Sequence, residues 1–144
     1  MSDADRLIAA ARVAAINAYA PYSKFSVGAA LLMNDGSIVT GANVENASYG
    51  LSLCAETVAL ATASAAGRLR DVMALGVVGG MSGKEGIDPI LPCGRCRQLL
   101  NEAAQLGQRD PAIYCSGLTG GPVEEYRLSE LLPHAFGPSE LGVG

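Results

Sequence analysis

The chain has 144 residues, 49% of them hydrophobic and 17% charged, with a formal net charge of −4. This length predicts a single domain over residues 1–144 with one sizeable core. The acidic balance argues against sequence-independent binding of nucleic acid, which needs clustered Lys and Arg, and no apolar run is long enough to cross a membrane.

The first elements that the sequence predicts are a helix and a hairpin. Ser2 and Asp5 form a capping pair, and apolar residues at 7, 11, 14 and 18 share one helical face until Pro21 ends the run. Residues 25–33 and 37–40 flank Asn34-Asp35-Gly36, a tight-turn sequence. We therefore expect an amphipathic helix followed by an antiparallel β-hairpin.

The rest of the chain alternates helical and strand patterns. We expect helices over about 54–66 and 92–107, each closed by a glycine (Gly67 and Gly107) in the left-handed conformation, and a short helix over 129–132. Buried strands are expected at 73–78 and 112–115, and an edge strand near 123–127. Crossovers of this length imply a parallel portion, so the sheet is mixed, with helices on both faces.

The four cysteines are the first sign of chemistry. An acidic, Ala-rich N-terminus is unlike a secretory signal, so we expect a cytoplasmic protein whose thiols serve metal binding or reactivity rather than disulfides. Cys93 and Cys96 lie three residues apart at the start of a predicted helix, where they share a face and backbone N–H groups favour thiolates.

A third thiol and an acid accompany this pair. Cys54 opens the other central helix, and at the cap position its sulfur turns toward the same point as the Glu56 carboxylate. Both helices follow strands whose ends meet at one sheet edge. We therefore expect Cys54, Cys93 and Cys96 to hold one zinc ion with an open position for water, and Glu56 to carry protons.

Simpler interpretations exist for each residue. Cys93 and Cys96 alone would fit a structural zinc half-site or a redox pair, but neither requires Cys54 and Glu56. A four-cysteine structural site would add Cys115, which the pattern places in mid-strand as a small buried hydrophobe. His134, the only histidine, is interpreted as a surface or packing residue rather than a ligand.

With these cysteines and this acid, the chain resembles the short cytidine deaminases of the zinc-dependent cytidine and deoxycytidylate deaminase family. Cys54-Ala55-Glu56, followed by Pro92-Cys93-Gly94-Arg95-Cys96-Arg97-Gln98, matches the zinc deaminase signature with Cys in place of its His. The resemblance extends along nearly the whole chain, through Ala20-Pro21-Tyr22-Ser23, residues 25–31, residues 41–49 and residues 131–136.

The resemblance implies a three-layer α/β/α fold with a mixed, mostly five-stranded sheet, in a homotetramer whose neighbouring subunits complete each active site. It also implies hydrolysis of the small-molecule nucleosides cytidine and 2′-deoxycytidine to the uracil nucleosides and ammonia. A zinc-bound hydroxide would attack C4 while Glu56 shuttles protons. By the same resemblance Asn43 and Glu45 bind the ribose 3′-hydroxyl, Phe25 packs on the base, the Ala55 backbone reads the pyrimidine edge, and Tyr49 and Phe136 complete a neighbour's pocket.

Two positions depart from the family pattern. The family commonly has Arg directly after Cys-Ala-Glu, where this chain has Thr57, and a neutral residue where this chain has Arg95. Three thiolates on zinc leave a net negative charge that donors must offset. We hypothesise that Arg95 or Arg97 supplies the missing positive charge; the alternative is that Arg95 is a solvated side chain.

Other functions stay open from the residues alone. A deaminase could act on another free pyrimidine compound, although Glu45 as a sugar-hydroxyl acceptor argues against it, and the acidic balance disfavours an editor of polynucleotides. A non-catalytic structural-zinc module is the alternative of another class, but it leaves Glu56 without a purpose.

Overall fold

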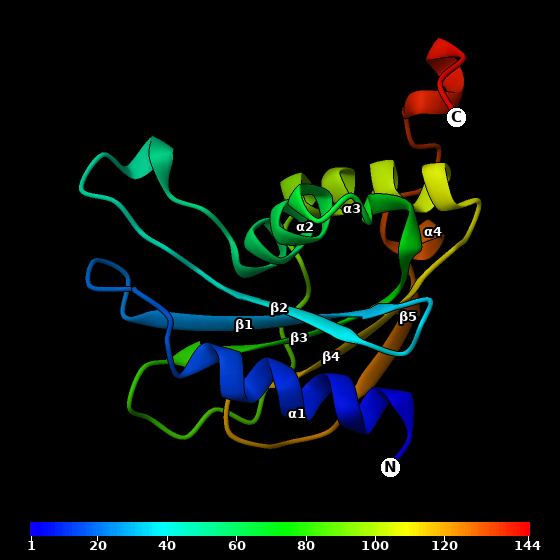
Figure 1. Ribbon diagram of the computed structural model, residues 1–144. Helices are drawn as coiled ribbons and strands as arrows, with labels where there is room; N and C mark the ends of the chain where they lie inside the picture. The colour runs from blue at the N-terminus through cyan, green and yellow to red at the C-terminus, as the bar shows by residue number, and fades with distance from the viewer.

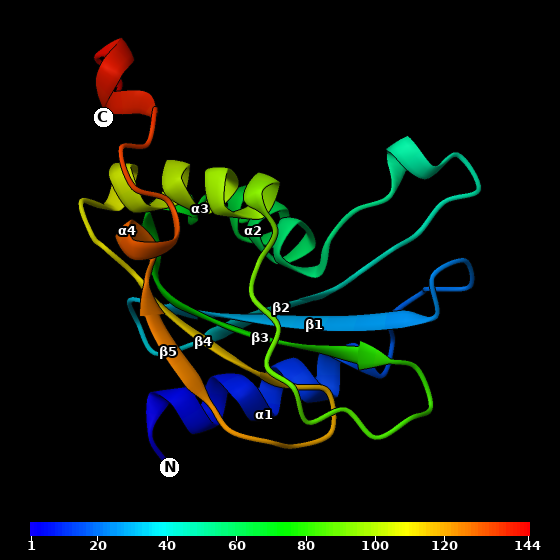
Figure 2. The same ribbon diagram turned by 180° about the vertical axis from the view of Figure 1, so that it is seen from behind.

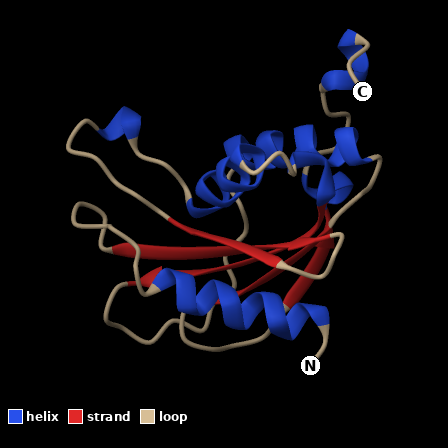
Figure 3. Ribbon diagram, in the orientation of Figure 1, coloured by secondary structure: helices blue, strands red, loops and turns tan.

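The computed structural model describes residues 1–144 as three layers (Figures 1 and 3). Helix α1 (Asp3–Ala15) covers one face of a five-stranded sheet. Helices α2 (Ala55–Ala65), α3 (Gly94–Gly107) and α4 (Leu128–Leu131) lie on the opposite side. The predicted α/β/α architecture with helices on both faces is confirmed. No helix is long and apolar enough to span a bilayer.

The sheet has the strand order β2-β1-β3-β4-β5. Its strands are β1 (Phe25–Met33), β2 (Ile38–Ala42), β3 (Val72–Met81), β4 (Ala112–Gly117) and β5 (Glu124–Arg127). Only β3 and β4 pair in parallel; β1 pairs antiparallel with both β2 and β3, and β5 pairs antiparallel with β4. The sheet is therefore mixed, and the hairpin predicted at its start is confirmed.

Two apolar clusters hold the layers together, one on each face of the sheet. Strand residues alternate between them: Ala29 and Leu31 point to the larger cluster, and Ala30 points to the smaller one under α1. The strand positions that support α2 and α3 are almost fully shielded from solvent, so these helices rest on a close-packed surface.

Two glycines let helices approach the sheet at backbone distance. A Cβ at Gly28 would lie 1.9 Å from the Ala11 carbonyl oxygen of α1, and one at Gly41 would lie 2.5 Å from the Ala55 oxygen of α2. Neither position has room for a side chain. Because Ala55 is the first residue of α2, the contact at Gly41 fixes where that helix begins.

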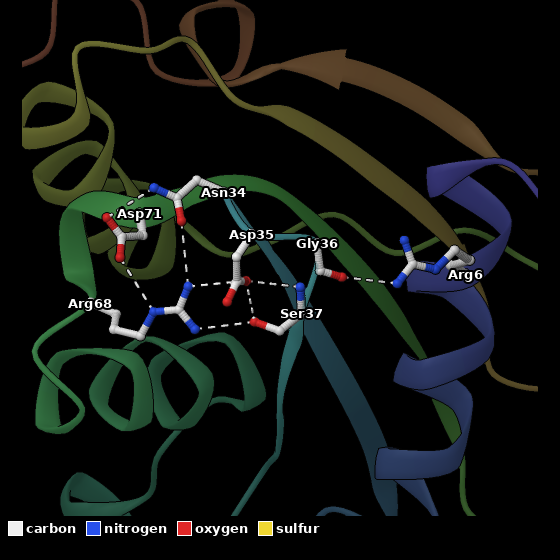
Figure 4. A network of polar contacts seen from close by, with 7 residues as sticks. All are labelled: Arg6, Asn34, Asp35, Gly36, Ser37, Arg68 and Asp71. Atoms are coloured by element: carbon white, nitrogen blue, oxygen red, sulfur yellow. Dashed lines mark hydrogen bonds and ion pairs between the residues drawn. The ribbon is translucent and has the colours of Figure 1, made fainter.

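The hairpin turn is tied to the end of α2 by a polar network (Figure 4). The Arg68 guanidinium contacts the Asp35 carboxylate at 3.1 Å and Asp71 at 3.3 Å, and it donates to the Ser37 hydroxyl. From the other face, Arg6 of α1 donates to the Gly36 carbonyl oxygen at 3.0 Å. The β1–β2 turn is thus fastened to both helical layers.

The segment between β2 and α2 projects from the body of the molecule (Figure 1). It returns on itself through backbone pairing of Val44 with Leu53 and carries a short 3₁₀ turn, Tyr49–Leu51. Val44, Tyr49, Leu51 and Leu53 are exposed large hydrophobic residues. We call residues 43–53 the projecting arm.

Three predicted boundaries are wrong. Strand β3 continues to Met81 rather than ending at residue 78. Helix α1 ends at Ala15 rather than continuing to residue 18, because Tyr19 leaves the helix to exchange backbone hydrogen bonds with the arm, at Asn43 and Glu45. At the end of α3 the left-handed residue is Gln108, with φ 56°, and not Gly107. Gly107 is instead the last helical residue, where a Cβ would lie 2.7 Å from the Arg70 carbonyl oxygen.

Candidate metal centre and its cavity

The structure brings together the three thiols that the sequence predicts as metal ligands. Cys54 is the N-cap of α2, Cys93 is the N-cap of α3, and Cys96 lies in the first turn of α3. Their sulfur atoms all lie within 4.8 Å of one another, and the Cys54 and Cys93 Sγ atoms are 3.9 Å apart. Both caps have extended backbone angles, which place each sulfur half outside its helix.

The sheet explains why two helix N-termini meet at this point. β2 and β3 each run antiparallel to β1 and therefore point in the same direction. α2 follows β2 and α3 follows β3, so both helices begin at the same edge of the sheet. The two helices pack against each other on one face of the sheet (Figure 2).

The electrostatics of the three thiols differ. Burial and the neighbouring Glu56 carboxylate raise the pKa of Cys96, and burial raises the pKa of Cys54. Burial acts in the same direction on Cys93, but hydrogen bonds from Cys96, from Cys54 and from the Arg95 backbone outweigh it and lower the pKa of that thiol. A bound cation would stabilise all three as thiolates.

Zinc fits this donor set. Three thiolates are soft ligands, and tetrahedral zinc with Zn–S bonds of about 2.3 Å separates its sulfurs by about 3.8 Å, close to the Cys54–Cys93 spacing. Cys115 lies outside the cluster: it is fully buried in β4, and burial raises the pKa of its thiol to about 12. Three ligands leave the fourth position of zinc open, as catalytic sites require.

Glu56 lies beside the sulfurs without joining them. Its side chain is 4% exposed, and burial raises the pKa of its carboxyl group. It lines a cavity of about 250 Å³ that two of the cysteines also border. The lining residues are Val27, Asn43, Glu45, Ser52, Leu53, Cys54, Ala55, Glu56, Leu91 and Cys93. A small molecule in this cavity would contact both the acid and the metal position.

Asn43, which also lines the cavity, is held by the backbone of β1. Its Oδ1 accepts a hydrogen bond from the Val27 N–H at 2.9 Å, and its Nδ2 donates to the Phe25 carbonyl oxygen at 2.9 Å. A primary amide has two donors and two acceptor sites. Asn43 therefore keeps one N–H and one acceptor site for a ligand.

Glu45 is anchored by the turn that precedes β1. Its Oε1 accepts from the Tyr22 N–H at 2.9 Å and the Ser23 N–H at 3.1 Å, and its Oε2 accepts from the Ser23 hydroxyl. The Ser23 hydroxyl is the main cause that lowers the pKa of Glu45, so the group is a carboxylate at neutral pH. Three of its approximately four acceptor sites are occupied, which leaves one on Oε2.

Three of the predicted substrate residues lie outside the lining of this cavity in the single chain. Phe25 lines a neighbouring hollow with Gly79 and Ile90. Tyr49 is 73% exposed on the projecting arm, where its ring packs edge-on against Tyr22 at 5.6 Å. Phe136 is 61% exposed on the C-terminal segment. Ala55, by contrast, is fully buried at the cavity wall.

The two departures from the family pattern have different surroundings. Thr57 Oγ1 lies 3.6 Å from Cys96 Sγ, so its hydroxyl contacts the sulfur cluster. Arg97 donates from Nε to the Pro92 carbonyl oxygen at 2.7 Å and from Nη1 to the Leu131 carbonyl oxygen at 3.0 Å. Arg95 is exposed. No hydrogen bond joins either arginine side chain to a sulfur, and charge compensation by them stays a hypothesis.

Sequence reasoning assigned no role to several residues at the site. Ser23 orients Glu45, while Val27, Ser52, Leu53 and Leu91 line the cavity. Ser23 and Val27 lie within the segments 20–23 and 25–31 that resemble the family, and this resemblance is the signal that could have found them. Ser52, Leu53 and Leu91 carry none, because the fold of the arm brings Ser52 and Leu53 to the cavity and the segment between β3 and α3 brings Leu91.

Fold and donor set together define a class: an α/β/α protein with a three-thiolate zinc centre at helix N-termini. Residues 1–107 match the family model described as the cytidine and deoxycytidylate deaminase zinc-binding region. The cytidine deaminase of Halalkalibacterium halodurans is 48% identical over 96% of this chain and 98% of its own. That of Mycobacterium tuberculosis strain CDC 1551 is 45% identical over 89% of this chain and 85% of its own.

Solved structures agree with the sequence relatives. The crystal structure of cytidine deaminase from Burkholderia pseudomallei has 45% sequence identity and a TM-score of 0.80, covering 94% of this chain and all of that one. The Mycobacterium tuberculosis enzyme gives 42% identity and a TM-score of 0.73, over 95% of this chain and 99% of that one. The chain belongs to the cytidine and deoxycytidylate deaminase family, whose members bind zinc.

Proposed function

We propose that this protein is a cytidine deaminase, which hydrolyses cytidine and 2′-deoxycytidine to uridine and 2′-deoxyuridine and releases ammonia. The observation that carries the proposal is the placement of Glu56, which lies beside three clustered thiols at the wall of a cavity of about 250 Å³. A structural zinc site has no use for a buried, unligated acid facing a cavity.

Each part of the site has a task in this reaction. Cys54, Cys93 and Cys96 would hold zinc, which would supply a water of lowered pKa as the nucleophile for C4 of the pyrimidine. Glu56 would accept one proton from that water and deliver it to N3, and would then take the remaining proton of the hydroxyl added at C4 and pass it to the amino group, which leaves as ammonia. Burial favours its protonated form and so suits it to hold the proton between these transfers.

The sugar is recognised by Asn43 and Glu45. Asn43 has one N–H to donate, and Glu45 has one acceptor site on Oε2. One hydroxyl group, which both accepts and donates, satisfies the two together. We assign this to the ribose 3′-hydroxyl, which cytidine and 2′-deoxycytidine share. The fixed backbone partners of both residues hold the pair ready before the substrate arrives.

The base is held by the remaining residues. The backbone of Ala55 reads the pyrimidine edge, and Phe25 packs on the ring. Tyr49 and Phe136 project from the chain and reach the pocket of a neighbouring copy in a homotetramer. Four free cysteines, three of them needed as thiolates, suit a reducing cytoplasmic location.

The test compares the wild-type protein with Glu56→Gln. The wild type should contain one zinc per chain and should convert cytidine. The change in ultraviolet absorbance measures this conversion. Glu56→Gln keeps size and hydrogen bonding, so it should retain zinc and bind nucleoside while losing more than about 10²–10⁴-fold in turnover, because one residue serves several proton transfers.

Glu102→Gln is the matched control, since it makes the same chemical change at an exposed position of α3. It should keep full activity. A zinc-replete Glu56→Gln variant with near-normal turnover would overturn the assigned role. A zinc-replete wild type that leaves cytidine unchanged would overturn the proposed function.

A further inference from the structure

Helix α3 carries three amide side chains on one face. Gln98, Asn101 and Gln105 are spaced so that they follow one another along the helix surface. We call these three residues the amide strip. The C-terminal segment runs from α4 past α3 and then away from the body of the protein (Figure 2).

The amide strip holds that segment at two points. Gln98 Nε2 and Asn101 Nδ2 both donate to the Phe136 carbonyl oxygen, at 2.8 Å and 3.1 Å. Gln105 Oε1 accepts from the backbone N–H and the hydroxyl of Ser139, at 3.0 Å and 2.5 Å. Two donors on one carbonyl oxygen fix the backbone at Phe136 more firmly than a single hydrogen bond would.

Gly137, which lies between Phe136 and Ser139, packs directly against the amide strip. A Cβ at Gly137 would lie 2.5 Å from Gln105 Oε1 and 2.6 Å from Asn101 Nδ2. Gly137 and the following Pro138 are both buried. The segment has no strand pairing. Its position is therefore set by side chains of α3, and the absence of a side chain at Gly137 permits the close approach.

The Phe136 ring contrasts with its backbone. Its carbonyl oxygen has two donors, yet the residue is 61% exposed, so a large apolar ring is held out from a fixed point of the chain. The Phe136 ring therefore contributes little to the hydrophobic core of its own chain. The amide strip lies on the 14-residue helix α3, so Phe136 is presented from a rigid element of the fold.

We propose that Gln98, Asn101 and Gln105 are positioning residues, which fix the Phe136 backbone against α3 so that its ring is presented to the nucleoside pocket of a neighbouring copy. This inference rests on the proposed function, in which Phe136 completes a neighbouring pocket. It assigns to the amide strip a role in substrate affinity, exerted through Phe136 and without contact between the strip and the substrate.

Gln98→Ala is the first test, because Gln98 is exposed and its loss leaves the core intact. KM for cytidine should rise roughly threefold to tenfold, with kcat changed less, since one of two hydrogen bonds to the Phe136 carbonyl is lost. Zinc content should stay at one per chain. Amide hydrogen exchange over residues 136–141 should accelerate in the same variant.

A double-mutant cycle separates positioning from a merely structural effect. If Gln98 acts through Phe136, then Gln98→Ala adds no further loss in a Phe136→Ala background. Glu102→Ala, exposed on the same helix and without a bond to the segment, is the matched control and should change neither KM nor exchange. Gly137→Ala should reproduce the Gln98→Ala effects by displacing the segment.

The outcomes distinguish this inference from the proposed function. If the KM effects of Gln98→Ala and Phe136→Ala multiplied in the double variant, the positioning role alone would be overturned. Faster amide exchange with an unchanged KM would have the same meaning. Unchanged exchange in both Gln98→Ala and Gly137→Ala would show that the strip does not hold the segment. A wild-type protein without cytidine turnover would overturn both.

Discussion

Residues of one type have different chemistry here because of where the fold places them. Three cysteines meet at helix N-termini and the fourth, Cys115, is enclosed in the core. We predict that Cys115→Ala retains one zinc per chain, because the pKa of this thiol, about 12, keeps it a neutral apolar group. Cys54→Ala, Cys93→Ala and Cys96→Ala should each lose zinc. Metal analysis of the purified variants measures this, and zinc loss in Cys115→Ala would show that the ligand set is wrong.

Ser23 should affect the preference for nucleoside over free base, although it has no assigned contact with the substrate. Its hydroxyl donates to Glu45 Oε2 and accepts from the Phe25 N–H. Because this hydrogen bond orients the Glu45 carboxylate, Ser23→Ala should lower kcat/KM for cytidine roughly tenfold. It should hardly affect the slow reaction of cytosine, which has no sugar hydroxyl for Glu45 to bind.

Steady-state kinetics with the nucleoside and the free base provide the measurement. Ser23→Thr keeps the hydroxyl and should retain most of the activity, which makes it the control. Equal losses on cytidine and cytosine would mean that Ser23 supports the fold of the turn and not the sugar site. The same comparison applied to Asn43→Ala tests the other half of the pair.

At the scale of elements, the network around Arg68 ties the β1–β2 turn to the end of α2 and should make stability depend on pH (Figure 4). Hydrogen bonds from Ser37, and then from Arg68, hold the pKa of the Asp35 carboxyl well below its usual range. A lowered folded-state pKa stabilises the protein above the unfolded pKa of about 3.9, and the contribution is lost as pH falls below that value.

We therefore predict that Asp35→Asn lowers the melting temperature at pH 7 and makes the drop between pH 5 and pH 2 shallower than in the wild type. The effect should be small, since the pair is exposed and screened by salt. Thermal unfolding across this pH range measures it, with Asp88→Asn as an exposed control that has no hydrogen-bond partner. Parallel wild-type and Asp35→Asn curves would rule out the pH-dependent contribution.

Local signals in the sequence predicted most elements, and the errors have tertiary causes. The Asn34-Asp35-Gly36 turn and the extended cap at Cys54 depend on neighbouring residues, and both are found. The end of α1 was misplaced because the Tyr19 pairing with the projecting arm is not encoded near Tyr19. Gly107 was misread as a stop because its close contact comes from Arg70, in the segment before β3.

The candidate site was predictable for the same reason, up to a limit. Cys54, Glu56, Cys93 and Cys96 could be placed because each lies at a helix start whose direction the sheet fixes. The partners of Arg97, by contrast, are the carbonyl groups of Pro92 and Leu131, which only the folded chain brings to it. No pattern in the sequence indicates that the Arg97 side chain donates to these two carbonyl groups.

At the scale of the whole molecule, the single chain leaves apolar side chains exposed on two projections. The arm exposes Val44, Tyr49 and Leu51, and the C-terminal segment exposes Phe136. Exposed apolar residues gathered in this way favour association with further copies. We predict a homotetramer in solution, and light scattering should give four times the chain mass of 14.7 kDa.

If a neighbouring copy supplies Phe136, two impaired variants should restore each other. In mixed oligomers of Glu56→Gln and Phe136→Ala chains, some sites combine Glu56 of one chain with Phe136 of another. With random mixing of equal amounts, about a quarter of the sites should be complete. Activity should therefore rise above that of either variant alone after joint refolding. Glu56→Gln mixed with Cys54→Ala should recover none, because both residues belong to the site of one chain. The Phe136→Ala variant must itself be impaired for this test to apply. If mixed tetramers then form and activity does not recover, Phe136 belongs to the site of its own chain.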